Sequence, residues 1–462
     1  MLRTSLYALP FLLGSSAILH ATEAKDVLEN YANIALAGYE DSLILATSLK
    51  DAVDALVADP NDATLAAAKA AWVQARVPYQ QTEAFRFGNP TVDEWEGKVN
   101  AWPLDEGLID YIAADYGENE ENPFSTANVI ANAKLNVGGT MIDAGSITPA
   151  LLESLHEVEG IEANVATGYH AIEFLLWGQD LSGTSHGAGT RAATDFDIEN
   201  CTGENCDRRI QYLVAATDLL ISDLEDAVAN WSAGGQGRTD VTTDASQGIV
   251  MAFTGLGSLS YGEQAGERMK LGLMLNDPEE EHDCFSDNTH NSHYFDGLGI
   301  RNVYTGRYVR VDGSLVEGPS LYDLVRAKDA VLGDALLSDL NSTMMALGDI
   351  RTAAESGTSY DQMLGAEHPG GALVQAAIDK RVISNVLLLL LGRKASRSKA
   401  QTAWITQTQY SNKSDKSKFL MGRFWSAHFP FWHKNLCSQH QIWGCLLVYF
   451  GKVLKKISRN FL

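Results

Sequence analysis

The sequence lacks the short motifs that mark several large enzyme classes, and it contains few cysteines. It has no G-x-S-x-G nucleophile elbow, no phosphate-binding glycine loop and no complete dinucleotide fingerprint. These absences leave no sequence evidence for a serine hydrolase of that type, a P-loop NTPase or a Rossmann enzyme. Only three of the 5 cysteines precede residue 392, which is too few for a four-cysteine zinc ribbon in that part of the chain.

Basic residues are also scarce in most of the chain. The formal net charge is -24, from 35 basic and 59 acidic residues. Residues 392–462 contain 13 of the basic residues and one acidic residue, so residues 1–391 carry 22 basic against 58 acidic side chains. This acidic body argues against nucleic acid as a partner, because phosphate binding requires clustered Lys and Arg. It is compatible with cation binding, although most of the charge is expected on a solvated surface.

The two ends of the chain differ from its middle. Arg3 and the apolar run Leu6–Leu19 indicate a secretory signal peptide over residues 1–21, since the run is shorter than the roughly 20 residues of a membrane span. The basic segment 392–462 could bind the acidic body, nucleic acid or an anionic membrane surface. We favour an aberrant segment, frameshifted or disordered and without a function.

Helical periodicity dominates the body and predicts an all-α fold. The expected helices are Ala24–Ala58, Ala63–Glu83, Ser146–Trp177, Arg208–Trp231, Asp244–Met274, Leu321–Leu332, Ala335–Glu355 and Gly371 to about Leu391. A glycine-rich linker, Ser232–Gly237, divides them into two sets. The simplest architecture is therefore two helical-bundle domains, residues 22–235 and 236–391.

The best functional lead lies in the predicted helix around Gly168–Gly178. His170 and Glu173 are three residues apart in an apolar run, so both lie on one helix face. Buried ionisable groups must be paired or must coordinate a metal, and this pair suits iron or zinc equally. The spacing also fits a buried histidine that bonds to its own glutamate. Neither H-E-x-x-H nor H-x-x-E-H is present, because position 174 is phenylalanine.

Other ionisable groups are candidates with a structural alternative for each. Glu83 and Asp105 could supply oxygen ligands to the metal, and Arg86 lies in the same region; helix capping and loop anchoring explain these residues too. A loop with His282, His290 and His293 among acids could bind a metal, but its polarity favours a solvated loop.

A second group of charges lies on one predicted helix. Glu263 and Glu267 are one turn apart, with Arg268 beside them, and a structural ion-pair network explains them as well as a site does. Cys201 and Cys206 are spaced for a short disulfide, which would form in an oxidising compartment.

Several segments together resemble the imelysin-like family, most closely its iron-regulated protein A branch, over about residues 25–380. They are Gly168-x-His170-x-x-Glu173 with the following Phe-Leu-Leu-Trp-Gly, Glu83-x-x-Arg86-Phe87-Gly88, Trp102-Pro103-Leu104, Gly262-Glu263-x-Ala265-Gly266-Glu267-Arg268-Met269 and His282-Asp283-Cys284-Phe285-Ser286-Asp287-Asn288-Thr289. The resemblance implies two helical bundles related by a pseudo-repeat, export to the periplasm or the outer surface, and expression linked to iron supply. It also implies that the G-x-H-x-x-E site lies beside the interface of the two bundles.

Three functional hypotheses follow. The first is a periplasmic or outer-membrane-associated protein that binds an iron or zinc ion through His170 and Glu173, with help from Glu83 or Asp105. The second is a metallopeptidase, which the family's classification as insulin-cleaving imelysin peptidases suggests. Glu173 would then be the catalytic base for a peptide substrate. The third is a metal-free module that binds a peptide or haem between the bundles.

Overall fold

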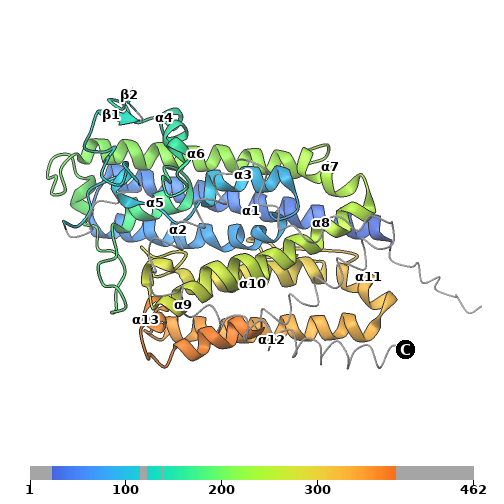
Figure 1. The fold of residues 1–462 in the computed structure, drawn as a ribbon. Coiled ribbons are helices and arrows are strands. Elements are labelled where there is room, and N and C mark those ends of the chain that lie inside the picture. The colour runs from blue at the N-terminus through green and yellow to red at the C-terminus, as the bar shows by residue number, and fades with distance from the viewer. Residues whose placement is uncertain (1–22, 115–121, 138, 381–462) are drawn as a thin grey trace, which may run out of the picture. The chain divides into compact units, whose positions relative to one another are not determined.

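A computed structural model of the protein describes residues 23–114, 122–137 and 139–380 (Figure 1). The signal peptide predicted for residues 1–21 and the basic segment 392–462 both lie outside these described residues. So does the end of the last predicted helix, beyond residue 380.

Helices make up most of the described chain, which confirms the all-α prediction. The α-helices are α1 (Ala24–Ala58), α2 (Asp62–Thr82), α3 (Pro90–Asn100), α4 (Pro149–Leu155), α5 (Gly168–Trp177), α6 (Cys206–Trp231), α7 (Gln236–Thr242), α8 (Ala245–Ser258), α9 (Leu271–Leu275), α10 (Thr289–Thr305), α11 (Leu321–Lys328), α12 (Ala330–Glu355) and α13 (Tyr360–Leu364); residues 371–380 are also helical. Short 3₁₀ turns are η1 (Glu83–Phe85), η2 (Glu106–Leu108), η3 (Val158–Gly160), η4 (Ala193–Phe196) and η6 (Pro278–Glu280).

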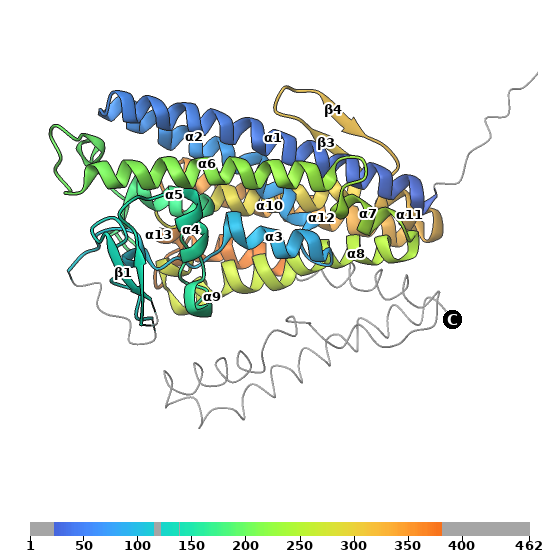
Figure 2. The same ribbon diagram turned by 90° about the horizontal axis from the view of Figure 1, so that it is seen from above.

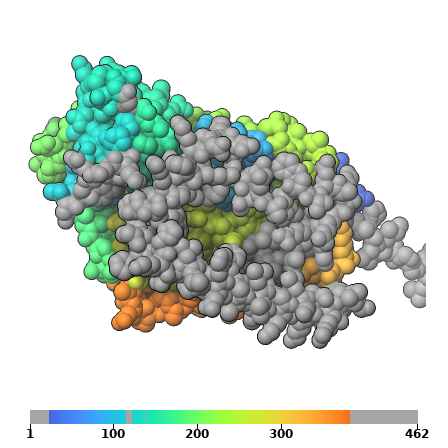
Figure 3. Space-filling model, in the orientation of Figure 1, coloured from blue at the N-terminus to red at the C-terminus, as the bar shows by residue number. Residues whose placement is uncertain are grey.

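Two small antiparallel hairpins are the described strands. They pair β1 (Lys134–Val137) with β2 (Thr140–Asp143), and β3 (Arg307–Val309) with β4 (Leu315–Glu317). The β1–β2 hairpin lies beside α4 on the surface that Figure 3 shows. The β3–β4 hairpin is held against α1, because the buried Asp41 carboxylate accepts bonds from the Tyr308 hydroxyl (2.9 Å) and from Arg310 (2.8 Å).

Local sequence signals explain where the long helices begin. Asn61 starts α2 with a capping box, in which its side chain accepts from the Thr64 amide while the Thr64 hydroxyl accepts from the Asn61 amide. Asp329 caps α12 in a similar way, through the amide of Leu332. The predicted bounds of the first helix, Ala24–Ala58, are those of α1.

The helices of the two predicted sets pack together along α2 and α10. Helices α1, α2 and α6 lie side by side, and α10 lies between α2 and α12 (Figures 1 and 2). One buried apolar cluster contains residues of both sets, such as Trp72 of α2 and Ile300 of α10; a smaller cluster joins Met269, Leu347 and Met363. The domain boundary near residue 235 stays a prediction, with α7 beginning at Gln236.

The structure departs from the expected helices in several places, including α3 and α7, which were not predicted. The predicted helix Ser146–Trp177 is divided into α4 and α5, because Glu157, Glu159 and Gly160 take positive φ angles that end the helical path. The helix α10 was not predicted, since its polar start resembles a loop. Among the helices that the structure describes, none has both the length and the apolar character needed to cross a membrane.

Candidate metal centre

Helix α5 carries the G-x-H-x-x-E motif into the interior, where all of its 10 residues are buried. Gly168 begins the helix with a φ of +80°, and a Cβ there would lie 2.4 Å from the carbonyl oxygen of Val99, near the end of α3. The first position of the motif therefore requires glycine for both its conformation and its close contact. The Trp72 indole donates to the Tyr169 carbonyl (2.9 Å), which fixes α5 against α2.

Two buried histidine rings face each other beside this helix. The ring of His170 lies 4.8 Å from that of His282, centroid to centroid, at an interplanar angle of 66°. His282 comes from the loop between η6 and α10. Potential ligand atoms of His170, His282 and Asp283 all lie within 4.8 Å of one another, which makes them one of two such groups among the described residues.

Each histidine uses Nδ1 in a hydrogen bond and leaves Nε2 available. His170 Nδ1 lies 3.0 Å from Glu173 Oε2. The hydrogen bonds around Gln80 are consistent with one orientation of its amide group. In that orientation the amide oxygen accepts from His282 Nδ1 (3.3 Å) and from Arg76 (2.9 Å). Neither Nε2 atom has a hydrogen-bond partner within the described part of the chain. A buried nitrogen without a partner is costly, whereas a metal ion would use both.

The environment keeps both imidazoles neutral. Burial, with a smaller effect of Arg76, lowers the pKa of His170 to about 3. Burial, with Arg268 next in effect, also lowers the pKa of His282 well below its ordinary value. Neutral imidazole is the form that binds metals. An Nδ1–H held by an oxygen acceptor would direct each Nε2 lone pair at the metal.

Asp283 supplies the carboxylate of the group. Burial, the largest single effect, raises its pKa, but the Arg76 guanidinium 2.8 Å away, His170 and the hydrogen bonds from Ser292 and Asn288 together lower it below its ordinary value. Its other oxygen accepts from Asn288 (2.8 Å) and Ser292. A carboxylate has about four lone-pair sites, so one remains for a metal ion.

Glu173 lies beside His170 rather than in the group of ligand atoms. Its Oε1 accepts from both the amide (3.0 Å) and the hydroxyl (2.6 Å) of Ser286. Burial, followed by the charge of Asp283, raises the pKa of Glu173 well above its ordinary value. A cation at the two Nε2 atoms would oppose this shift and favour the ionised carboxylate.

The remaining predicted candidates mostly form ion pairs. Glu83 accepts from Asn100 (2.6 Å) through one oxygen and pairs with Arg268 (2.8 Å) through the other. Arg268 also pairs with Glu263 (2.9 Å), and Arg86 lies 3.0 Å from Glu96. Glu83 Oε2 is ion-paired without a hydrogen bond. These residues form a network of ion pairs beside the centre, and Glu83 as a metal ligand stays a prediction.

A π-helical segment explains the pairing within this network. The segment η5 (Leu259–Lys270) continues α8 without a break and leads into α9. Its i→i+5 geometry places Glu263 and Arg268, five residues apart, in contact. The predicted candidate Glu267 is exposed, and no ion pair is recorded for it among the described residues.

Asp105 is held in a different set of bonds. Its carboxylate accepts from the Asn122 side chain (2.9 Å), and its amide donates to the Ala163 carbonyl (2.9 Å). It does not belong to the group around His170. As a ligand of that metal, Asp105 stays a prediction.

Sequence reasoning missed the roles of Arg76 and Gln80. Arg76 is 1% exposed, donates to Asn100 (2.6 Å) and lies among aromatic rings, including Trp72 and Tyr169. No local pattern marks either residue, because their partners are far away in the sequence. The loop of His282 and Asp283 was a candidate for metal binding, but its polarity favoured a solvated loop; that preference was wrong, because both side chains are 0% exposed.

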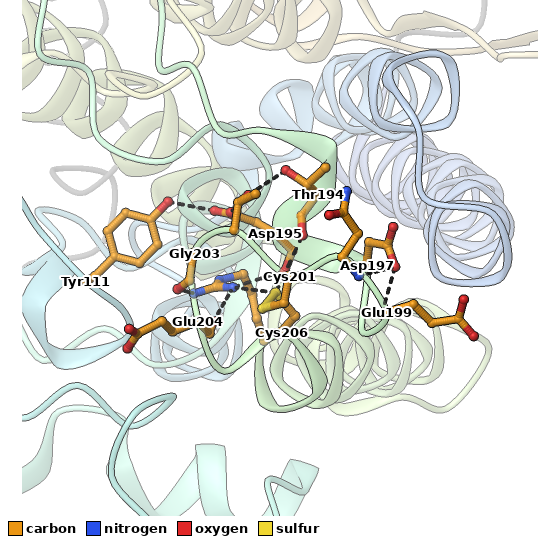
Figure 4. Close-up of a disulfide and its surroundings, with 12 residues drawn as sticks. Tyr111, Thr194, Asp195, Asp197, Glu199, Cys201, Gly203, Glu204 and Cys206 are labelled. Carbon is orange, nitrogen blue, oxygen red and sulfur yellow. Dashed lines mark hydrogen bonds between the residues drawn. A yellow bond between two sulfur atoms is a disulfide. The ribbon is translucent and has the colours of Figure 1, made fainter.

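Cys201 and Cys206 are joined in a disulfide at the start of α6 (Figure 4). Next to it, the buried Arg209 donates to the Asp110 carboxylate (2.6 Å) and to the Asp195 carbonyl (3.0 Å). The disulfide therefore closes a loop that is fixed by a buried guanidinium.

Comparison with known proteins gives the same family as the motifs. Residues 35–383 match the family of peptidases named imelysin. The chain belongs to the imelysin family. A stretch of 77 residues is 35% identical to iron-regulated protein A of Synechococcus elongatus, covering 17% of this chain and 22% of that relative's length.

The imelysin fold is also supported by a solved structure. A protein from Parabacteroides distasonis, described as an iron-regulated protein A precursor, superposes with a TM-score of 0.59. The likeness covers 83% of this chain and 97% of that one. At 19% identity it shows the fold alone.

Proposed function

We propose that this imelysin protein binds a transition-metal ion, with iron the first choice, through Nε2 of His170 and His282 and a carboxylate oxygen of Asp283. The observation that supports this most directly is the pair of buried, neutral imidazoles whose Nε2 atoms lack partners. Two imidazoles and one carboxylate suit non-haem Fe(II), and they also suit zinc. The relatives named as iron-regulated favour iron.

Glu173 and Gln80 would orient the two ligands. Each supplies an oxygen to the Nδ1 side of one imidazole, an arrangement that fixes ring orientation at metal sites. Glu173 and Asp283 would also offset the charge of the ion, against the single positive charge of Arg76. The G-x-H-x-x-E motif thus contributes one ligand and the group that positions it.

This proposal favours binding over peptide hydrolysis. Glu173, the base that a peptidase would use, is 0% exposed and already accepts two bonds from Ser286. The buried ligands also lack the exposure that a peptide chain would need for access.

An exported location is part of the proposal. The apolar run near the N-terminus is typical of a signal peptide, and a disulfide is typical of an oxidising compartment. We therefore expect the protein in the periplasm or associated with the outer membrane.

Metal analysis of the full chain tests this function. The protein would be purified without chelator or metal-binding tag, loaded anaerobically with Fe(II) or with Zn(II), and compared with His170→Ala and His282→Ala. We expect one ion per chain in the wild type and loss in both variants. The control is His186→Ala, which removes an exposed histidine and should keep the metal.

A wild type that takes up neither ion would refute the proposal and leave the metal-free peptide or haem module. Equal uptake by His170→Ala would place the metal elsewhere. Turnover of a peptide that a chelator stops, and that is lost in both His170→Ala and Glu173→Ala, would establish the peptidase instead.

A further inference from the structure

A second group of carboxylates lies outside the histidine centre. Potential ligand oxygens of Asp180, Asp287 and Asp361 lie within 4.8 Å of one another. They come from distant parts of the chain: the segment after α5, the loop before α10, and α13. Tertiary packing therefore brings together three acids that no sequence motif connects.

Two buried acids at this point lack the partners that buried carboxylates need. Asp361 is 0% exposed and Glu281 is 1% exposed, and the groups nearest their oxygens in the described part of the chain are neutral donors in poor hydrogen-bond geometry: Ser359 and the Gln362 amide for Asp361, and Thr289 for Glu281. One buried oxygen of Asp287 has no hydrogen-bond partner among the described residues. A buried ion without a partner costs several kcal/mol in typical proteins, so these oxygens indicate a missing cation.

Glu281 is a buried carboxylate near the group, outside the 4.8 Å set. It lies close enough to Asp361 and Asp287 that, after burial, their charges raise its pKa most. Burial and then the charges of Asp361 and Asp180 raise the pKa of Asp287 to about 7. The Thr289 hydroxyl partly offsets the rise for Glu281; burial raises the pKa of Asp361, partly offset by Ser359, by the Gln362 amide and least by His186. The groups that shift the pKa values of these four carboxylates include no lysine and no arginine.

Other buried carboxylates near the histidines do have a positively charged partner. Buried Glu83 pairs with Arg268 at 2.8 Å, and buried Asp283 pairs with Arg76 at 2.8 Å. The fold thus provides guanidinium partners for carboxylates near the histidines, but not for the group around Asp361. A protein that binds nothing there would have to keep shared protons on crowded acids.

We propose that Asp180, Asp287 and Asp361, with Glu281 as a fourth carboxylate, bind a hard divalent cation of the Ca²⁺ class. Four carboxylates without a nitrogen or sulfur ligand match the oxygen preference of Ca²⁺. Mg²⁺ fits less well, because it demands near-octahedral geometry and usually takes only one or two protein carboxylates. This site contains no histidine ligand and is independent of the proposed iron centre.

The test measures Ca²⁺ on the full chain after chelator treatment and dialysis, by calorimetry and by thermal unfolding with and without CaCl₂. We expect the wild type to bind one Ca²⁺ and to unfold at a higher temperature in its presence. Asp287→Asn and Asp361→Asn should each weaken Ca²⁺ binding by roughly tenfold or more. Both changes preserve side-chain size and should leave the folded protein intact, because they remove repulsion between like charges.

The matched control is Glu280→Gln, which removes one charge from the same loop but lies outside the group; it should bind Ca²⁺ as the wild type does. His170→Ala should also keep Ca²⁺ while losing iron, so the two sites can fail separately. A wild type whose unfolding temperature does not respond to Ca²⁺ would overturn the proposal. So would Asp361→Asn and Asp287→Asn proteins that bind Ca²⁺ with unchanged affinity.

Discussion

Replacing Gly168 by alanine is the sharpest test of how the motif is positioned. The residue has a φ of +80°, and the added Cβ would lie 2.4 Å from the Val99 carbonyl oxygen. A left-handed conformation costs alanine about 1 kcal/mol, and forcing an extra carbon into a packed interior costs about 1–3 kcal/mol. We therefore expect Gly168→Ala to lower the free energy of unfolding by about 2–4 kcal/mol. Equilibrium urea unfolding measures this loss.

Gly160 provides the control that separates the two costs. Its φ is +72°, but nothing lies within 4 Å of the position of a Cβ, so Gly160→Ala should lose only about 1 kcal/mol. Equal losses in the two variants would show that contact with Val99 contributes nothing. Gly168→Ala should also weaken iron binding, since His170 follows two residues later; unchanged affinity would mean that α5 adjusts without moving its ligand.

Three further changes test the surroundings of the centre. Arg268→Met should cost about 3–5 kcal/mol in urea unfolding by leaving Glu83 without its guanidinium, whereas the exposed Arg326→Met should cost under about 1 kcal/mol. Burial raises the pKa of Glu96 from 4.5 to about 7, so the folded protein favours the protonated carboxyl group. This contribution to stability is fully present below pH 4.5 and is lost as the pH rises through 7. Glu96→Gln should flatten that decline in thermal unfolding. A double serine variant of the disulfide should lose about 2 kcal/mol, given its short loop, and keep the metal; unchanged stability would contradict this.

Long regular helices could be predicted from the sequence, but their interruptions could not. The apolar periods of α1 and α6 continue over many turns, so their positions follow from local pattern alone. The break between α4 and α5 depends on left-handed residues, two of which are glutamates. Glutamate has no preference for that conformation, so the residue types at these positions do not predict the break.

The sequence predicts only those residues of the candidate centre that lie close together along the chain. His170 and Glu173 could be paired because they are three residues apart on one helix. His282 and Asp283 join them from 109 or more residues away, and Arg76 enters from a third segment. Nothing in a single sequence specifies which loop packs against which helix. The sequence suggested Glu83 or Asp105 as the assisting carboxylate, and the proposal of Asp283 in that role needed the structure.

The π-helical segment η5 has a consequence for how this protein can tolerate change. Each of its turns accommodates more residues than an α-helical turn does, so losing a single residue could be repaired locally by a return to α-helical bonding. Such a deletion would restore ordinary backbone geometry while rotating Arg268 away from Glu83 and Glu263. Deletions in this segment should thus have a mild effect on helix formation. Their effect on the buried ion pairs beside the histidines should be severe, so the helix could be kept while its ion pairs are lost.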